Sequence, residues 1–240
     1  MTNYSICPIA LCEGGRNASQ YSYCLNYDDN CTTVCYSWYI KGSKPKILVD
    51  TGQTASMSKG WDRDLISPED GLAKLGLKPE DIEIVILTHL HFDHIALSSM
   101  YRRAKFIVQR RELDYARDPH PIDARLYRRN VFDNLNLEVI DGQKEIIPGV
   151  SVFLTPGHSP GGQSVQINTA AGKAIITGFC CHLFTFAQTD AVKEKGWEVA
   201  APLVHHDVRE AYDSVLKVKR SADIIIAQHD QTFINKNTIP

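Results

Sequence analysis

The residues best suited to chemistry stand in one short segment and are His89, His91, Asp93 and His94. On an extended segment His89 and His91 project to the same side, because side chains alternate with a period of two. If the chain then turns into a helix, Asp93 and His94 face a second point nearby. One loop can therefore supply ligands to two neighbouring metal ions, which together activate water and polarise a carbonyl group. Structural zinc sites prefer four ligands dominated by cysteine, so we interpret this segment as a catalytic metal centre.

The segments around this cluster have the patterns of an α/β protein. Residues 82–87 are apolar and rich in β-branched side chains, which predicts a buried strand leading into the histidines. Residues 46–49 predict a similar strand ending at Asp50, and residues 222–227 predict another before His229. Ser67 followed by Pro68 gives the N-cap and first-turn signals of a helix.

The segment T-H-L-H-F-D-H at residues 88–94, placed after an apolar strand, resembles the metallo-β-lactamase superfamily. Further landmarks match in chain order, namely D-T-G at 50–52, T-P-G-H-S-P-G-G at 155–162 and A-Q-H-D at 227–230. The H-L-H-F-D-H segment and P-L-V-H at 202–205 look most like the N-acyl homoserine lactonase group within it. The resemblance implies one α/β domain over residues 1–240, an αββα sandwich of two mixed sheets flanked by helices.

The resemblance also implies which side chains form the metal centre. The first ion would be held by His89, His91 and His158, and the second by Asp93, His94 and His229. Asp50 would lie beneath them, where a carboxylate accepts a hydrogen bond from a ligand ring and fixes its tautomer. The implied cofactor is one or two Zn²⁺ ions, with Fe or Mn as alternatives.

The sequence departs from the family pattern after residues 173–178. Relatives carry there an aspartate that bridges the two metals, and this chain has Phe179, followed by Cys180 and Cys181. Either one of the two cysteines ligates metal, or two ions are bridged by hydroxide alone, or the centre uses one ion. Two dications about 4 Å apart repel by roughly 16 kcal/mol at an effective dielectric near 20, so losing a bridging anion weakens the second site. Two cysteines packed beneath the site are the plain structural alternative.

The expected activity is that of a lactonase-like metallo-hydrolase, in which a metal-activated water opens an ester-like carbonyl bond. Asp93 would ligate metal and carry the proton to the leaving group. His182 falls where homoserine lactonases have a substrate-binding tyrosine, and it would contact the substrate or stabilise the oxyanion. The alternatives are a thioesterase or cyclic amide hydrolase of the same fold, or a redox or non-catalytic relative, given the missing bridging aspartate.

Composition limits the other partners. A formal net charge of −2 and 22 % charged residues give no basic footprint for nucleic acid, and no apolar run approaches the ~20 residues of a membrane span. We therefore expect a small-molecule substrate, no nucleic acid and no membrane. The seven cysteines and the absence of a signal-peptide pattern indicate the cytoplasm.

Two segments are set apart by their composition. The segment of about residues 1–35 holds five cysteines and is expected to be irregular, with those cysteines acting as small buried hydrophobes. The segment of about residues 110–130 is strongly charged, which predicts a solvated helical insert. Following the family, the insert could instead form a lid over the substrate or the contact of a homodimer.

Overall fold

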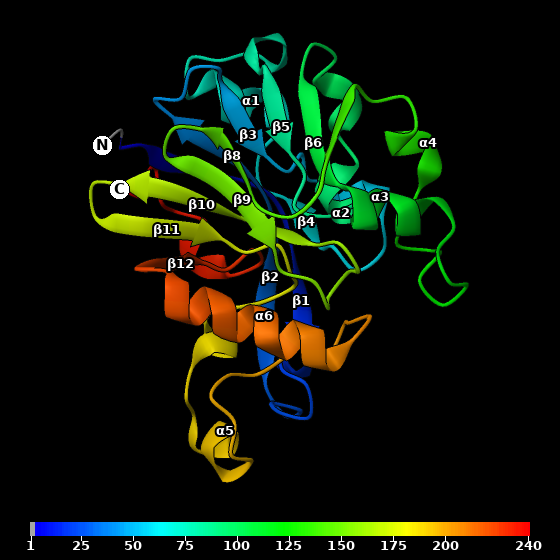
Figure 1. The fold of residues 1–240 in the computed structure, drawn as a ribbon, viewed down its shortest axis with the longest axis vertical. Coiled ribbons are helices and arrows are strands. Elements are labelled where there is room, and N and C mark those ends of the chain that lie inside the picture. Colours follow the sequence, from blue (N-terminus) through cyan, green and yellow to red (C-terminus); the bar gives the residue numbers. More distant parts are fainter. Residues whose placement is uncertain (1–2) are drawn as a thin grey trace.

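Two mixed β-sheets face each other in the computed structural model, which describes residues 3–240 (Figure 1). The first sheet has seven strands in the order β4-β1-β2-β3-β5-β6-β7. Their bounds are β1 Ser5–Asn17, β2 Asn30–Lys41, β3 Ile47–Val49, β4 Arg63–Asp64, β5 Ile84–Ile86, β6 Lys105–Gln109 and β7 Leu137–Ile140. The run from β3 to β7 is parallel, while β1, β2 and β4 add antiparallel pairs.

The second sheet has five strands in the order β12-β11-β10-β9-β8. Their bounds are β8 Lys144–Ile147, β9 Val150–Leu154, β10 Gln163–Thr169, β11 Gly172–Ile176 and β12 Ile224–Ile226. The strands from β8 to β11 are antiparallel, and β12 pairs in parallel with β11. The carboxyl ends of β9, β11 and β12 therefore lie at one edge of the sheet.

Helices cover the outer faces of both sheets and complete four layers. The bounds are α1 Pro68–Ala73, α2 Phe92–Ile95, α3 Arg110–Arg117, α4 Arg129–Phe132, α5 Asp190–Glu194 and α6 Val208–Ser221, with short 3₁₀ turns between them. One apolar cluster, including Trp38, Ile86 and Val165, fills the space between the sheets. A second joins the first sheet to α1 and α3, and a third joins the second sheet to α6. The predicted αββα sandwich is confirmed.

The predicted elements around the histidine cluster are also confirmed. Ser67 caps α1, because its side chain accepts a hydrogen bond from the backbone N–H of Asp70. The strands β3 and β5 pair in parallel, so Asp50 and His89, which follow them, reach the same edge of the first sheet. Within residues 3–240, none of the helices has the length and apolar character needed to cross a bilayer.

The expectation of an irregular segment over about residues 1–35 is wrong for most of the described part. The strand β1 spans Ser5–Asn17 and pairs antiparallel with β2 along almost its whole length, with one register shift between Ala10 and Cys12. The backbone ladder of this pairing accommodates residues such as Gly14 and Asn17 that have weak strand propensity by themselves. Residues 1 and 2 lie outside the described part of the chain.

The charged insert is helical only at its two ends. The helix α3 ends at Arg117, and α4 begins at Arg129, with turns between them that contain Pro119 and Pro121. Proline lacks an N–H donor and disfavours a helical conformation of the residue before it, which accounts for the break. The insert is also not fully solvated, because Leu113 is buried.

Candidate metal centre

Three buried histidines form the first group of possible metal ligands. His89, His91 and His158 each offer one ring nitrogen, and these atoms lie within 4.8 Å of one another. The Nε2 atoms of His89 and His158 are 3.3 Å apart. His89 and His91 precede α2 on an extended stretch, as the spacing predicted, and His158 comes from the loop after β9. The structure thus brings together the three residues expected at the first site.

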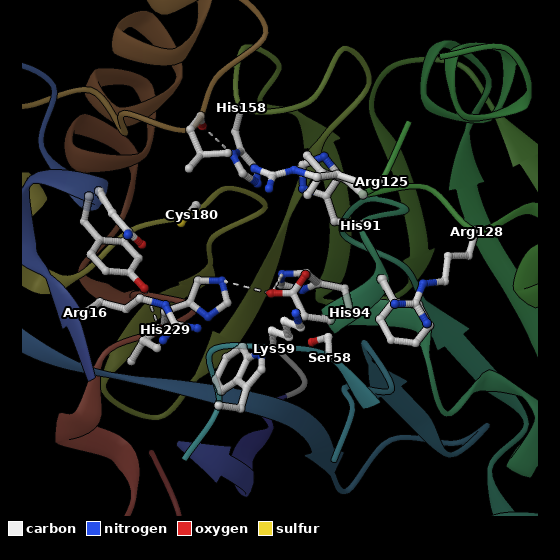
Figure 2. A pocket seen from close by; sticks show the side chains of 18 residues that line it. Arg16, Ser58, Lys59, His91, His94, Arg125, Arg128, His158, Cys180 and His229 are labelled. Carbon is white, nitrogen blue, oxygen red and sulfur yellow. Dashed lines mark hydrogen bonds and ion pairs between the residues drawn. The ribbon is translucent and has the colours of Figure 1, made fainter. Parts of the chain in front are cut away.

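A second group lies next to the first and consists of Asp93, His94 and His229. Helix α2 starts at Phe92, so the chain turns just where Asp93 and His94 must face a new direction. Oδ2 of Asp93 is 3.7 Å from Nε2 of His94 and 4.0 Å from Nε2 of His229. The rings of His94 and His89 have their centroids only 4.0 Å apart, so the two groups are neighbours. In Figure 2 a dashed line runs from the ring of His229 toward the side chains beside His94.

Asp50 lies beneath these rings and is fully buried. Its Oδ1 accepts the backbone N–H of Thr88 at 2.8 Å, and its Oδ2 accepts the Thr88 hydroxyl at 2.7 Å and Nδ1 of His94 at 2.8 Å. The side-chain amide of Gln228 donates to the same Oδ2. With a proton on Nδ1, His94 presents the lone pair of Nε2 to its group, which is the arrangement expected of a ligand.

Backbone carbonyls orient two further rings. Nδ1 of His158 donates to the carbonyl of Val204 at 2.7 Å, and Nδ1 of His229 donates to the carbonyl of Val34 at 3.0 Å. In both rings the other nitrogen, Nε2, is left with its lone pair toward the ligand group. These hydrogen bonds fix the tautomer that binds metal.

Burial keeps most of these imidazoles neutral. Burial, reinforced by the neighbouring histidines, lowers the pKa of His89 and His91 well below the ordinary value. Burial also lowers the pKa of His158 to about 4 and that of His229 to about 3. For Asp93, burial alone would raise the pKa, but the neighbouring histidines outweigh it and the pKa is lowered. Neutral nitrogens and one carboxylate are the ligand types that bind divalent transition metals, so both groups fit such an ion.

Burial also acts on His94, with a different outcome. It lowers the pKa of this ring, but the carboxylates of Asp93 and Asp50 outweigh it, and the pKa is raised. A cation near Nε2 would favour the neutral ring that the hydrogen bond to Asp50 already orients.

Glu112 is a supporting residue that the sequence pattern did not indicate. It is fully buried, and its two carboxylate oxygens accept the backbone N–H groups of Leu90 and Gly161, each at 2.9 Å. Glu112 thereby ties the loop of His89 to the loop of His158. A Cβ atom on Gly161 would lie 2.1 Å from the backbone nitrogen of Glu112, so only glycine fits there. In the sequence, Glu112 is one charged residue in a charged run and carries no distinguishing signal.

The turn after β11 directs the side chain at the position of the family's bridging aspartate away from the metal centre. Phe179 is 1 % exposed and packs in the third apolar cluster, with Phe186 among its neighbours. Cys180 lines the pocket at the metal centre. Cys181 is fully buried, and its Sγ lies 3.1 Å from the Thr177 hydroxyl. Neither cysteine belongs to the two ligand groups, and only Cys180 faces the pocket.

His182 does not lie where a direct substrate contact would require. It is 2 % exposed, does not line the pocket, and stacks on Phe184 with a centroid distance of 5.0 Å. Tyr21 packs against it at 4.2 Å and itself lines the pocket. The hydroxyl of Tyr21 donates to that of Thr33 at 2.6 Å. A long antiparallel pairing of β1 with β2 carries Tyr21 to this place, which the sequence alone did not reveal.

The two ligand groups open into one pocket of about 340 Å³ (Figure 2). His91, Asp93, His94, His158 and His229 all line it. Its other walls come from the 3₁₀ turn at Ala18–Tyr21, from residues 58–61 and from the charged insert. Figure 2 shows Arg125 and Arg128 of the insert beside the histidines. The insert therefore borders the site, and its role as a lid or as a dimer contact stays a prediction.

Comparison with known proteins agrees with this geometry. Residues 32–229 match the family model described as the metallo-beta-lactamase superfamily. The chain is 29 % identical over 222 residues to an N-acyl homoserine lactonase of Bacillus thuringiensis. The matched segment covers 84 % of this chain and 82 % of that protein. It is 32 % identical over 164 residues to an N-acyl homoserine lactonase of Bacillus cereus, covering 62 % of this chain and 63 % of that protein.

Solved structures give the same picture. A quorum-quenching N-acyl homoserine lactone lactonase superimposes with a TM-score of 0.76 at 25 % identity, covering 96 % of this chain and 94 % of that one. An N-acyl homoserine lactone hydrolase with N-hexanoyl-L-homoserine bound at its catalytic metal centre superimposes with a TM-score of 0.75 at 25 % identity. The match covers 96 % of this chain and 95 % of that one.

Proposed function

The chain belongs to the metallo-beta-lactamase superfamily, and from that premise we propose that it opens a lactone by hydrolysis. The observation that carries the proposal is the pair of adjacent ligand groups, His89-His91-His158 and Asp93-His94-His229. All of these residues except His89 line one pocket. The relatives in Bacillus cereus and Bacillus thuringiensis are N-acyl homoserine lactonases, and that similarity favours a lactone over other carbonyl substrates.

We assign one divalent ion to each ligand group, and zinc as the ion, because five imidazoles and one carboxylate match its preference for nitrogen and oxygen ligands. Iron and manganese accept the same donors and are the alternatives. When bound, the ions lower the pKa of a water molecule and polarise the carbonyl group of the substrate.

The protein's own groups must move one proton during ring opening. Hydrolysis adds water across the ring C–O bond, so one proton leaves the attacking water and one reaches the oxygen that leaves the carbonyl carbon. Asp93 is the sole acid among the described residues that line the pocket. We assign that proton transfer to the Asp93 carboxylate, which lies at the centre of its ligand group.

The hydroxyl of Tyr21 is the donor we assign to the substrate, in place of His182. Tyr21 lines the pocket, and its hydroxyl donates a hydrogen bond to that of Thr33 beside it, so the pair can reorganise around a substrate oxygen. His182 supports the Tyr21 ring from behind at 4.2 Å and acts as a positioning residue.

Cys180 is the cysteine that we propose as an additional contact to metal. It faces the pocket, whereas Cys181 packs in the apolar cluster. Burial and the nearby Asp93 raise the pKa of the Cys180 thiol well above its usual value, and a bound cation would reverse that tendency. Metal content of Cys180→Ser, with Cys181→Ser as the matched control, tests this point. A selective loss of metal in Cys180→Ser is expected, and an unchanged content would contradict it.

The function is tested by combining metal analysis with a hydrolysis assay. Zinc-loaded protein is offered a lactone, a thioester and a cyclic amide, and acid release is followed at constant pH. We expect the lactone to be opened fastest, and His158→Ala to lose both metal and activity. His120→Ala is the matched control, because His120 is exposed and belongs to neither ligand group. Preference for the thioester or the amide would overturn the lactone assignment, and protein that binds no metal would overturn the mechanism.

A further inference from the structure

We propose that the substrate carries an anionic group, a carboxylate or a phosphate, on the part of the molecule away from the scissile carbonyl. Four cationic side chains around the pocket would recognise it, namely Arg16, Lys59, Arg125 and Arg128. This inference rests on the proposed lactone hydrolysis and narrows its substrate class.

The charge of the pocket differs sharply from that of the whole chain. The pocket lining holds these four cations and one acid, Asp93, whereas the formal net charge of the chain is −2. Figure 2 shows Arg16 and Arg128 on opposite sides of the histidines, so positive charge borders the centre from more than one direction. Charge of one sign around a low-dielectric cleft concentrates oppositely charged ligands.

These four cations are not engaged in ion pairs within residues 3–240. Neighbouring cations are paired, as shown by Arg63 with Glu13 at 2.6 Å and Arg129 with Asp133 at 3.1 Å. By contrast, Arg16 donates only to backbone carbonyls, those of Gly15 and Gly60. The cationic charge at the pocket is therefore available to a ligand.

Two of the guanidinium groups are held in place by aromatic rings. The guanidinium of Arg128 lies over the ring of Phe92 at 3.4 Å from its centroid, and that of Arg16 lies over Trp61 at 5.3 Å. Stacking restricts the side chains before any ligand arrives, which lowers the entropic cost of binding an anion.

The insert that supplies Arg125 and Arg128 is anchored to the ligand loop. Phe92 directly precedes the ligand Asp93, and its backbone N–H donates to the carbonyl of Leu126 in the insert at 2.8 Å. Arg125 and Arg128 flank this contact in the sequence, so their distance from the metal centre is set by the same hydrogen bond. A substrate bridging from the ligand groups to the insert would place its anionic end there.

The test compares three lactones with the same ring and a side arm that ends in a carboxylate, a phosphate or a neutral carboxamide. For the zinc-loaded protein we expect kcat/KM to be at least about tenfold higher for one or both anionic lactones, because one charge-assisted hydrogen bond is worth that much. The preference should shrink as salt is raised, since exposed charges are screened. Comparing the carboxylate with the phosphate identifies which anion the pocket favours.

Variants connect the preference to these side chains. Arg125→Gln/Arg128→Gln should reduce the ratio of anionic to neutral kcat/KM, whereas Arg103→Gln should leave it unchanged. Arg103 is the matched control, because it borders a different hollow with Glu69 and Pro79. Equal kcat/KM for the charged and neutral lactones, or an unchanged ratio in the double variant, would overturn the inference.

A binding measurement separates this inference from the proposed function. Calorimetry is used to compare ring-opened hydroxy acids whose side arms end in a carboxylate or a carboxamide. Tighter binding of the dicarboxylate, weakened by Arg125→Gln/Arg128→Gln, would support the anionic substrate even if no lactone were opened. In that case the lactone assignment alone would fail. Equal binding of both compounds would refute the anionic substrate whatever the hydrolysis assay gives.

Discussion

Replacing Asp50 with asparagine should weaken the binding of one metal ion much more than the other. Asparagine has the same shape as aspartate and tolerates the left-handed backbone that Asp50 adopts, with φ of 54°. The substitution therefore changes hydrogen bonding without adding backbone strain. The affected groups are Thr88, His94 and Gln228, which all donate to the Asp50 carboxylate.

The cost falls on the tautomer of His94. If the asparagine oxygen keeps the backbone N–H of Thr88, its amide N–H groups face the proton on Nδ1 of His94. His94 could avoid this by moving its proton to Nε2, but Nε2 faces Asp93 and is the atom needed for metal. The Thr88 hydroxyl can adapt, because its oxygen can accept the new amide N–H while it still accepts Nδ1–H of His89 at 3.0 Å. This arrangement thus leaves His94 less able to bind a cation, whereas the flipped amide would set its own N–H groups against the backbone N–H of Thr88.

The expected magnitude follows from these contacts. Losing one buried hydrogen bond costs about 1–3 kcal/mol of folding stability in the metal-free protein. Removing the partner that orients a ligand ring typically costs about 10–100-fold in metal affinity, or about 1.4–2.7 kcal/mol. The loss should fall on the group of Asp93, His94 and His229, because Asp50 bonds no ring of the other group.

The assay is a calorimetric titration of metal-free protein with zinc. Wild type should show two binding steps, and Asp50→Asn should weaken one of them by the stated factor. Asp114→Asn is the matched control, because Asp114 is exposed and lies in α3. Denaturant unfolding of all three proteins shows how much folding stability is lost. If both steps weaken equally, or neither changes while the protein stays folded, the tautomer reasoning is wrong.

Three further predictions concern stability. Removing metal with a chelator should lower the midpoint of thermal unfolding, and added zinc should restore it, because an ion bound only to the folded state stabilises it by mass action. Metal-free protein should lose stability as the pH falls from about 6.5 toward 4. The pKa values of His158 (about 4) and His229 (about 3) are lowered in the folded state, so over this range the unfolded chain binds protons that the folded chain does not. Each pH unit should cost up to about 1.4 kcal/mol per histidine in urea unfolding, and a flat profile would contradict the burial of these rings. Glu112→Gln should cost about 1–3 kcal/mol, because one amide N–H must then face a backbone N–H of Leu90 or Gly161, and stability equal to wild type would refute that role.

The sequence predicted the local part of the site because that part depends on local geometry. The period of a strand places His89 and His91 on one side, and the start of α2 turns Asp93 away from them. The distant members, His158 and His229, came from resemblance to a family. Nothing in their own surroundings distinguishes them from other loop histidines until the sheets are assembled.

The rest of the site depends on tertiary contacts that have no local signal. Glu112 and Arg125 occur in the same charged segment, yet one is buried between two loops and the other lines the pocket. The turn after β11 is not a strand, so alternation could not show that Cys180 rather than Phe179 faces the pocket. The cytoplasmic location and the homodimer stay predictions.

The departure from the family pattern and the cationic pocket can be understood together through charge. The resemblance places the bridging carboxylate at Phe179, which packs in the apolar cluster, and the next residue, Cys180, faces the pocket instead. Burial favours the neutral thiol of Cys180 until metal is bound. The ligand groups then hold one carboxylate, Asp93, and Asp50 lies beneath them as the nearest hydrogen-bonded acid. Two divalent ions in such a centre would leave excess positive charge, and Arg125 with its neighbouring cations adds more. This charge is a cost to the unliganded protein, since like charges repel over these distances. A substrate that brings its own negative charge offsets that cost on binding, whereas a neutral lactone leaves it in place.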